Sequence, residues 1–514
     1  MILYGIISVK IKQAWYLGEA LPAVFFGVIL GPISAKFIES EKWGSAEPGQ
    51  TSAITLGIAR VMIGVQLVIA GYQLPAKYGL TRWKEMALCL LPIMTVMWLC
   101  TTACIMVTIP NLTLLAALVI GSCVTCTDPI LSQAIAKGPF ADKYVPRPLR
   151  EVISAEAGAN DGFGFPFLML ATYLIQHAEN PPATAEAVAE GVSGVEAGHA
   201  LMARAGEVGR LGGGVGVAMA NWFVETWLYT IVLSIAYGAV LGFGSCKGVK
   251  FALKFKWIDE ESYVLFPTAI GLFTVGTCGA LGTDDLLACF VTGMALNWDG
   301  NYLRETERRH DEVNSCVDVL LNFGGFMYIG AILPWGASMI PLVLASPGAV
   351  LLDLVSSSLS SAEALFMGYF GPIGAGAVFY VEHARHLFPH DGEGDEEETN
   401  LVRAMGPVVY WLVLFSIIVH GLSIPALNIF YHYTGKAPIQ DDAVELRRIS
   451  VRVVTPPNAI AGDKDTFIAY NRFSRHIDPS AASLPSNRSR DDNSFSDDDD
   501  DDLGKGQKHG MAIV

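Results

Sequence analysis

Two polar clusters inside apolar stretches are the part of this sequence that can do chemistry. In the first, "TCTDPILSQ", residues 125–133, Thr127 and Asp128 are followed directly by Pro129. An aspartate at membrane depth costs roughly 2.5 to 3.5 kcal/mol, so it needs a reason. Pro129 opens the helix, and the exposed carbonyl and hydroxyl oxygens form the oxygen shell that a small alkali cation prefers. Alternatively, Asp128 only caps a broken helix, and this stretch alone leaves both readings open.

The second cluster lies in "SAEAGANDGFGFPFLML", residues 154–170. Glu156, Asn160 and Asp161 stand at positions i, i+4 and i+5, so a helix places them on one broad face. The alternative pairs Glu156 with a basic residue and buries Asp161 as a neutral acid. Two ionisable residues on one face, beside a broken helix that carries a third, favour a site for cations and protons. Asp161 and Asp128 are then the expected ligands of a transiently bound Na+.

Two adjacent carboxylates, Asp284 and Asp285, open an apolar run in "CGALGTDDLLACF". Acids at a helix start commonly accept hydrogen bonds from the first amides and face the positive end of the helix dipole. The other interpretation places both side chains on an ion pathway or in its coupling to the proton. The sequence leaves the two interpretations equally open.

A second interrupted helix is predicted in "GYFGPIGAGAVFY", residues 368–380, which contains Gly371, Pro372 and Gly374. Glycines in an apolar segment can also indicate close helix packing. The Gly-Pro pair fits a broken helix better, because proline cannot continue the hydrogen-bond ladder. Two interrupted helices in opposite halves of a chain indicate an inverted-repeat transporter, with the ion site where the breaks cross.

The elements that must position these residues are membrane-spanning helices. The chain has 514 residues, of which 52% are hydrophobic and 16% charged, and this composition excludes an ordinary soluble protein. Several apolar runs are long enough to cross a hydrocarbon core of ~30 Å, and they lack the alternation of outer-membrane strands. The fold class is therefore an all-α polytopic membrane protein. The clearest runs are Glu19–Phe37, Ala53–Leu74, Met86–Ile109, Leu112–Ala136, Trp222–Phe243 and Val408–Phe430.

Basic residues fall on every second loop between the expected spans, and the other loops are acidic or short. Since positive loops stay in the cytosol, this alternation predicts roughly twelve crossings with both ends cytosolic. The count requires Pro334–Ser360 to be a span. Met1–Val9 has the character of the last half of a further span, and it is not a cleavable signal peptide.

The chain divides into a transmembrane domain, residues 1–430, and a tail, residues 431–514, that we expect to be disordered in the cytosol. The net charge of −16 is concentrated in segments such as 391–398 and 497–502, so it gives no nucleic-acid footprint. The nine cysteines lie mostly in apolar segments without metal-ligand spacing, as small buried residues do.

At these residues the chain resembles the fungal plasma-membrane sodium/proton antiporters of the cation/proton antiporter superfamily. The resemblance extends from Gly5 to about Leu387. It departs at Ala157, where the family usually has serine, at Leu342–Ser361, which lacks the family's Arg-Arg-Leu-Pro, and at a first helix cut short at Met1. The matching segments are "WYLGEALPAVFFGVILGP", "TDPILSQAIAKGPFADKYVPRPLREVISAEAGANDG", "FPFLML", "FTVGTCGALGTDDLLACFVTGMALNWDG" and "FGPIGAGAVFY".

The resemblance implies alternating-access exchange of cytosolic Na+ or Li+, and often K+, for external protons, for salt tolerance and pH homeostasis. It implies a multi-pass plasma-membrane protein, a homodimer in the lipid bilayer, without enzymatic activity or a cofactor. Asp284 and Asp285 matter for transport in the family. The positions that it assigns to ion binding are Thr127, Asp128, Glu156, Asn160 and Asp161.

Two other function classes compete with an antiporter. A channel, or a transport-impaired membrane scaffold that acts through its tail, would show no proton flux coupled to a sodium gradient. An intramembrane aspartyl protease also uses two membrane aspartates that share a proton. By family resemblance such a protease needs a Gly-x-Gly-Asp segment, which "GTDD" at residues 282–285 does not supply.

Overall fold

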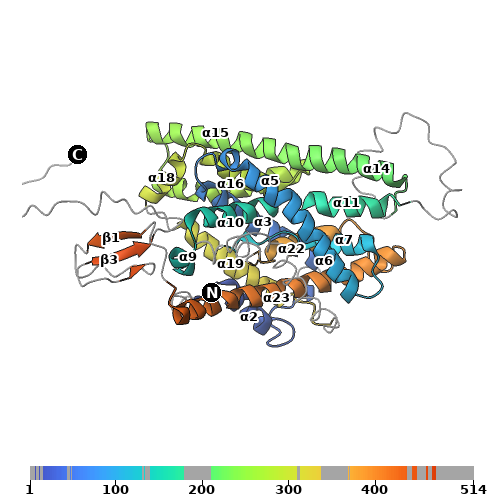
Figure 1. Ribbon diagram of the computed structural model, residues 1–514. Coiled ribbons are helices and arrows are strands. Elements are labelled where there is room, and N and C mark those ends of the chain that lie inside the picture. The colour runs from blue at the N-terminus through green and yellow to red at the C-terminus, as the bar shows by residue number, and fades with distance from the viewer. Residues whose placement is uncertain are drawn as a thin grey trace, which may run out of the picture. The chain divides into compact units, whose positions relative to one another are not determined.

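The computed structural model places helices over most of the predicted transmembrane domain (Figure 1). The residues that it describes are 6, 11, 15–42, 47, 49–129, 132, 139–178, 210–309, 313–336, 369, 371–436, 443–447, 459–460 and 466–470. The helices of the first half are α2 Ala20–Leu30, α3 Gln50–Gln73, α4 Tyr78–Thr81, α5 Trp83–Leu88, α6 Met94–Thr108, α7 Leu114–Cys123, α9 Pro139–Tyr144, α10 Arg147–Asn160 and α11 Phe165–Gln176. Those of the second half are α14 Gly214–Asn221, α15 Leu233–Phe255, α16 Glu260–Leu281, α17 Asp285–Leu296, α18 Asn301–Arg308, α19 Val313–Ala331, α22 Ala375–Arg385 and α23 Glu396–Thr434.

Segments of other helix types complete these elements. A 3-10 turn η2 covers Ser40–Lys42, and the π-helical segments η3 Cys89–Ile93 and η5 Trp222–Val232 join the helices on either side of them. Pro92 lies inside η3, where its missing N–H explains the local widening of the helix. Through η5, helices α14 and α15 form one helical segment, Gly214–Phe255, that includes the predicted span Trp222–Phe243.

The prediction of membrane-spanning helices is confirmed by length and composition. Within the described residues, five helical segments are long and apolar enough to cross a membrane, and three shorter apolar helices join them, including α7 and α17. The segments are Gln50–Gln73, Trp83–Thr108, Gly214–Phe255, Glu260–Leu281 and Glu396–Thr434. The predicted span Pro334–Ser360 lies outside the described residues from 337 onward.

The predicted span Leu112–Ala136 is not one continuous helix. Helix α7 ends at Cys123, residues 124–128 are not helical, and helical structure resumes at Pro129. The hydroxyl of Thr125 donates to the backbone oxygen of Gly121 at 2.8 Å, which satisfies a carbonyl that the helix end leaves open. The second interruption precedes α22, where residues 371–374 have no regular structure. Both predicted broken helices are therefore present.

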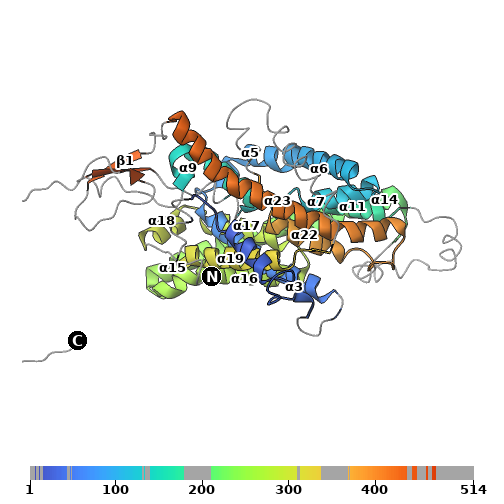
Figure 2. The ribbon, with the colours of Figure 1, turned by 90° about the horizontal axis from the view of Figure 1, so that it is seen from below.

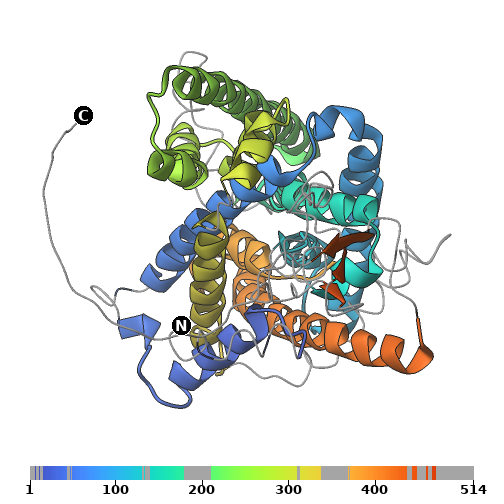
Figure 3. The ribbon, with the colours of Figure 1, turned by 90° about the vertical axis from the view of Figure 1, so that its left-hand side faces the viewer.

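Helices α15 and α23 lie on opposite sides of the bundle, and α7 and α22 lie between them (Figure 1, Figure 3). On one flank, α7 packs against α6 and α11 (Figure 2). Helix α3 packs against α16, α17 and α22, so it connects both halves of the chain. Its contact with α17 is close because Gly71 and Gly293 face the backbone of the partner helix, where a Cβ would overlap it.

The boundary between the transmembrane domain and the tail differs from the sequence prediction. Helix α23 continues past residue 430 to Thr434 and ends at Gly435, which has a φ of 65°. Three strands follow in the segment predicted to be disordered, and they form an antiparallel sheet in the order β1-β3-β2. Val444 and Leu446 alternate with charged residues in β1, a period that strands favour and that the composition of the tail as a whole conceals. The strands are β1 Ala443–Arg447, β2 Ala459–Ile460 and β3 Thr466–Tyr470.

Candidate functional site

The two interrupted helices touch at their breaks through Asp128. Its backbone N–H donates to the carbonyl of Pro372 at 2.6 Å, and its Oδ2 accepts from the N–H of Ala375 at 2.5 Å. Asp128 therefore caps the first turn of α22, where free amides and the helix dipole stabilise negative charge. The capping alternative holds in an unexpected form, because the capped helix is not the one that carries Asp128.

Glycines allow this contact. A Cβ at Gly374 would overlap the carboxylate of Asp128, and a Cβ at Gly376 would overlap that of Asp161. Gly371 and Pro372 belong to the same segment without regular structure, and the carbonyl of Pro372 is the acceptor described above. The glycine-rich stretch is thus both a broken helix and a place of close approach, which joins the two interpretations of the sequence.

Thr127, Asn160 and Glu156 form one hydrogen-bonded group across the first break. The amide oxygen of Asn160 accepts from the backbone N–H of Thr127 at 3.2 Å. The amide nitrogen of Asn160 donates to Thr127 Oγ1 at 2.8 Å and to Glu156 Oε1 at 2.6 Å. Thr127 Oγ1 also donates to Glu156 Oε2 at 3.1 Å. Among the described residues Glu156 has no basic partner, so the predicted alternative of an ion pair is not what the structure shows.

Asp161 lies at the centre of the site with an unpartnered carboxylate. Its side chain is fully buried, and neither carboxylate oxygen has a hydrogen-bond partner in the described part of the chain. Tyr380 fixes the backbone instead, because its hydroxyl donates to the Asp161 carbonyl at 2.7 Å and accepts from Gly164 N at 3.1 Å. Asp128, Glu156 and Asp284 lie close enough to repel a charge on Asp161. A buried carboxylate among like charges requires a cation or a proton.

The described residues of this group differ in their exposure to solvent. Glu156 is partly exposed, whereas Asn160 and Asp161 are fully buried. Glu156 lies one turn before the end of α10, whereas Asp161 is the residue that follows the helix, so Glu156 is nearer the end that begins at Arg147. The candidate ion site therefore extends from the partly exposed carboxylate of Glu156 to the fully buried carboxylate of Asp161.

The adjacent aspartates Asp284 and Asp285 have different environments. Asp284 is the N-cap of α17 and accepts from Leu287 N at 3.0 Å. Asp285 lies 2.7 Å from Arg60 Nε in an ion pair with α3. Both aspartates are buried, while a third of the Arg60 side chain is exposed. The capping interpretation is confirmed for Asp284, and the pathway interpretation remains a prediction.

Three supporting residues were missed from the sequence. Arg60 lies inside the apolar run Ala53–Leu74, and a lone arginine within a predicted span is a signal that could have revealed it. Tyr380 carries no such signal, because a buried aromatic residue is usual. Ser416 of α23 accepts from Ile373 N at 2.8 Å and so holds the second break, and only the tertiary contact identifies it.

The described residues hold no group of three or more His, Cys, Asp or Glu side chains arranged for a resident metal. A transported Na+ is a substrate, and mixed carboxylate, amide and hydroxyl oxygens suffice for a hard monovalent cation. The site offers such oxygens from Thr127, Asp128, Glu156, Asn160 and Asp161.

Comparison with known proteins matches residues 1–429 to the family described as "Sodium/hydrogen exchanger, transmembrane". The chain belongs to the sodium/hydrogen exchanger family. Within this exchanger family it is 36% identical over 82% of its length to a probable Na+/H+ antiporter of Schizosaccharomyces pombe. It is 32% identical over 84% of its length to a Na+/H+ antiporter of Saccharomyces cerevisiae. The chain spans 54% and 42% of the length of these two relatives.

The exchanger fold is also found in a solved structure. The sodium proton antiporter of Methanocaldococcus jannaschii at pH 8 aligns with a TM-score of 0.51 at 16% sequence identity, over 82% of this chain and 96% of that one. At this identity the likeness shows the fold. It confirms the predicted all-α exchanger architecture for the transmembrane domain, and the two discontinuous helices are seen in this chain itself.

Proposed function

We propose that this chain exchanges Na+ or Li+, and also K+, for protons by alternating access around Asp161. The observation that carries the proposal is the fully buried Asp161 carboxylate, whose two oxygens have no hydrogen-bond partner among the described residues. The carboxylate lies where two interrupted helices meet, beside Asp128. The names of the curated relatives support the same activity.

The mechanism follows from competition for one carboxylate. Protonation removes the negative charge that a cation requires, so Asp161 binds a proton or a cation but not both. In the empty, deprotonated state the repulsion from Asp128 and Glu156 disfavours a bare charge. Either ligand relieves that repulsion, and the loaded site can then change access while the empty charged site cannot.

The neighbouring residues have distinct roles in this proposal. Asp128 neutralises the first turn of α22 and sets the position of the second break. Asn160 holds Thr127 and Glu156 together, and its role is therefore to position oxygens as well as to supply one. Glu156 is partly exposed and receives the ion first from its side of the membrane.

The test is expression of the chain in salt-sensitive cells that lack their own sodium exporters. Growth on Na+, Li+ and K+ at acid and neutral pH reports which cations are exported. Sealed vesicles then separate an antiporter from a channel or scaffold, because an imposed Na+ gradient must drive proton movement in an antiporter. An intact protein at the membrane with no Na+-driven proton flux would contradict the proposal.

The location and assembly follow from the same proposal. We place the protein in the plasma membrane on the family resemblance, and both termini in the cytosol on the alternation of basic and acidic loops. We also propose a homodimer, on the family resemblance. Cross-linking of the detergent-solubilised full chain tests the dimer, and a monomer at all concentrations would contradict it.

A further inference from the structure

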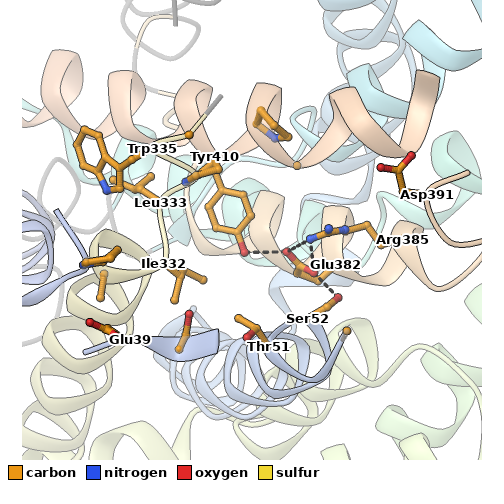
Figure 4. A pocket seen from close by; sticks show the side chains of 18 of the residues that line it. Glu39, Thr51, Ser52, Ile332, Leu333, Trp335, Glu382, Arg385, Asp391 and Tyr410 are labelled. Atoms are coloured by element: carbon orange, nitrogen blue, oxygen red, sulfur yellow. Dashed lines mark hydrogen bonds and ion pairs between the residues drawn. The ribbon is translucent and has the colours of Figure 1, made fainter. Parts of the chain in front are cut away.

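A cavity lies at one end of the bundle, away from the partly exposed Glu156. It has a volume of about 970 Å³ and is bounded by the segment after α2, the start of α3, the end of α19 and the facing parts of α22 and α23. Figure 4 shows Ser52, Glu382, Arg385 and Tyr410 pointing toward one another at its wall. None of the candidate ion ligands around Asp161 lines this cavity.

Glu382 is the buried carboxylate of this cavity, with 2% of its surface exposed. The hydroxyl of Tyr410 donates to its Oε1 at 2.8 Å, and the hydroxyl of Ser52 donates to its Oε2. Arg385 contacts both oxygens at 3.5 Å, with 42% of its side chain exposed. The carboxylate is therefore held firmly by two hydroxyls and loosely by one solvated guanidinium.

Helix α22 connects this carboxylate to the site at the helix breaks. Glu382 follows Ala375 by seven residues, so it lies on the same face of α22, about 10 Å further along the helix axis. Ala375 is the residue whose N–H binds Asp128. Between them on that face, Val378 and Phe379 are fully packed. The cavity therefore ends at Glu382, two helical turns short of the ion site.

We propose that Glu382, with the hydroxyls of Ser52 and Tyr410, is a second cation-binding site, which takes an alkali cation between the cavity and Asp161. This inference rests on the proposed function. Carboxylate and hydroxyl oxygens are the donors that hard monovalent cations prefer. Arg385 balances the charge of the empty site, and its long contacts and solvated position let an arriving cation displace it.

The position of this site makes its effect on exchange depend on the membrane face from which the ion enters. Glu156 is partly exposed at the opposite end of the polar group, so ions that enter there reach Asp161 without passing Glu382. Ions that enter or leave through the cavity pass Glu382 first. The second site therefore acts on exchange from one face of the membrane only, which a purely structural ion pair would not do.

The test is the Glu382→Gln variant of the full chain in sealed vesicles of both orientations. We expect the half-saturating Na+ concentration to rise about five- to tenfold when Na+ is supplied at the cavity face and to stay unchanged at the other face. The matched control is Asp391→Asn, since Asp391 lines the same cavity but is exposed and paired with Arg403. Equal effects at both faces, or the same shift in both variants, would overturn the proposal.

A binding measurement decides the inference independently of transport. In the Asp161→Asn background, which lacks the first carboxylate, NaCl should raise the melting temperature by about 2 °C over choline chloride at equal ionic strength. Adding Glu382→Gln should remove that rise. If Asp161→Asn shows no Na+-dependent rise, the second site does not exist. If wild-type vesicles show no exchange while the rise is present, the proposed function fails and this site stands.

Discussion

At the scale of single residues, the four buried aspartates of this region differ in their partners. Three of them have a hydrogen bond or an ion pair, and one has neither in the described part of the chain. Asp128 accepts from a helix amide, Asp284 caps α17, and Asp285 pairs with Arg60. Asp161 alone of these four has no hydrogen bond or ion pair in the described part of the chain. Asp128 and Asp284 accept from helix amides and Asp285 pairs with Arg60 at 2.7 Å, so of these four carboxylates Asp161 is the one whose charge is left for the exchanged ions to balance.

Asp161→Asn should abolish Na+/H+ exchange in protein that still reaches the membrane. The asparagine keeps the shape of the side chain but cannot bind and release a proton. In the wild type, the half-saturating Na+ concentration should also rise as cytosolic pH falls, because the proton competes for the same oxygens. Vesicle fluorescence with a pH-sensitive dye measures both effects. Wild-type exchange in Asp161→Asn would move the site to Asp128.

Asp285→Asn should destabilise the protein, whereas Asp284→Asn should not. Removing the charge of Asp285 leaves Arg60 without its partner, at a cost of about 1 to 3 kcal/mol, while asparagine caps a helix as well as aspartate does. Thermal melting of the purified protein measures the difference. Arg60→Gln added to Asp285→Asn should recover part of the loss.

These variants also test the pathway interpretation of the aspartate pair. If Asp284→Asn melts like the wild type but loses exchange, Asp284 belongs to the ion pathway in addition to capping α17. If Asp284→Asn keeps full exchange, its role is the cap alone. Equal melting temperatures for Asp285→Asn and the wild type would contradict the buried ion pair.

At the scale of elements, the site depends on how α22 meets the first break. Its first turn is capped by Asp128, its second position faces Asp161, and α23 holds the segment before it through Ser416. His420 of the same helix α23 contacts the carbonyl of Tyr369 at 2.9 Å. The second interrupted helix is therefore fixed from both sides, and a small displacement of α22 changes the space at the carboxylates.

Gly376→Ala should lower exchange at least tenfold without loss of helix stability. Alanine is favoured over glycine inside a helix, but its methyl group would overlap the Asp161 carboxylate and push α22 away from the site. Gly244→Ala in α15 is the matched control, since a Cβ there meets no atom within 4 Å. Initial exchange rates in vesicles at equal protein content compare the two. Similar rates would show that the close approach at Gly376 is not required.

At the scale of the whole molecule, solvent approaches the buried polar group from two opposite ends. Glu156 is partly exposed toward the start of α10, and the cavity at Glu382 ends on the far side of two packed helical turns of α22. Alternating access requires such an arrangement, with one route open to the site and the other closed. The conformation described here is closed between the cavity and Asp161.

The loop charges predict which of these ends faces the cytosol. An epitope tag at the C-terminus should be detected only in permeabilised cells, and a tag inserted at η2, Ser40–Lys42, should be detected in intact cells. This places the cavity at the external face, because Glu39 and Ser40 line it. Immunofluorescence with and without detergent makes the measurement. The reverse pattern would invert the orientation and the direction of the Glu382 effect.

The sequence by itself determined the features that depend on short separations along the chain. Helical periodicity places Glu156 and Asn160 on one face of α10, and Asp161 follows directly as the C-cap residue. Pro129 and the Gly371-Pro372 pair cannot continue a helical hydrogen-bond ladder, so an interruption near each was predictable, although the first helix already ends at Cys123 and resumes at Pro129. Apolar length predicted the spans, but overall tail composition concealed the alternation in β1.

Only the tertiary structure decided which side chains are partners across the bundle. Asp128 caps α22 across 247 residues of sequence, and Arg60 reaches Asp285 from a different helix. Glu382 follows the recognised glycine-rich stretch by a few residues, yet its cavity forms only when α3, α19 and α23 pack around α22. Periodicity determines on which face of its own helix a residue lies. Which other helix that face contacts depends on how the helices pack, and no local sequence pattern encodes this.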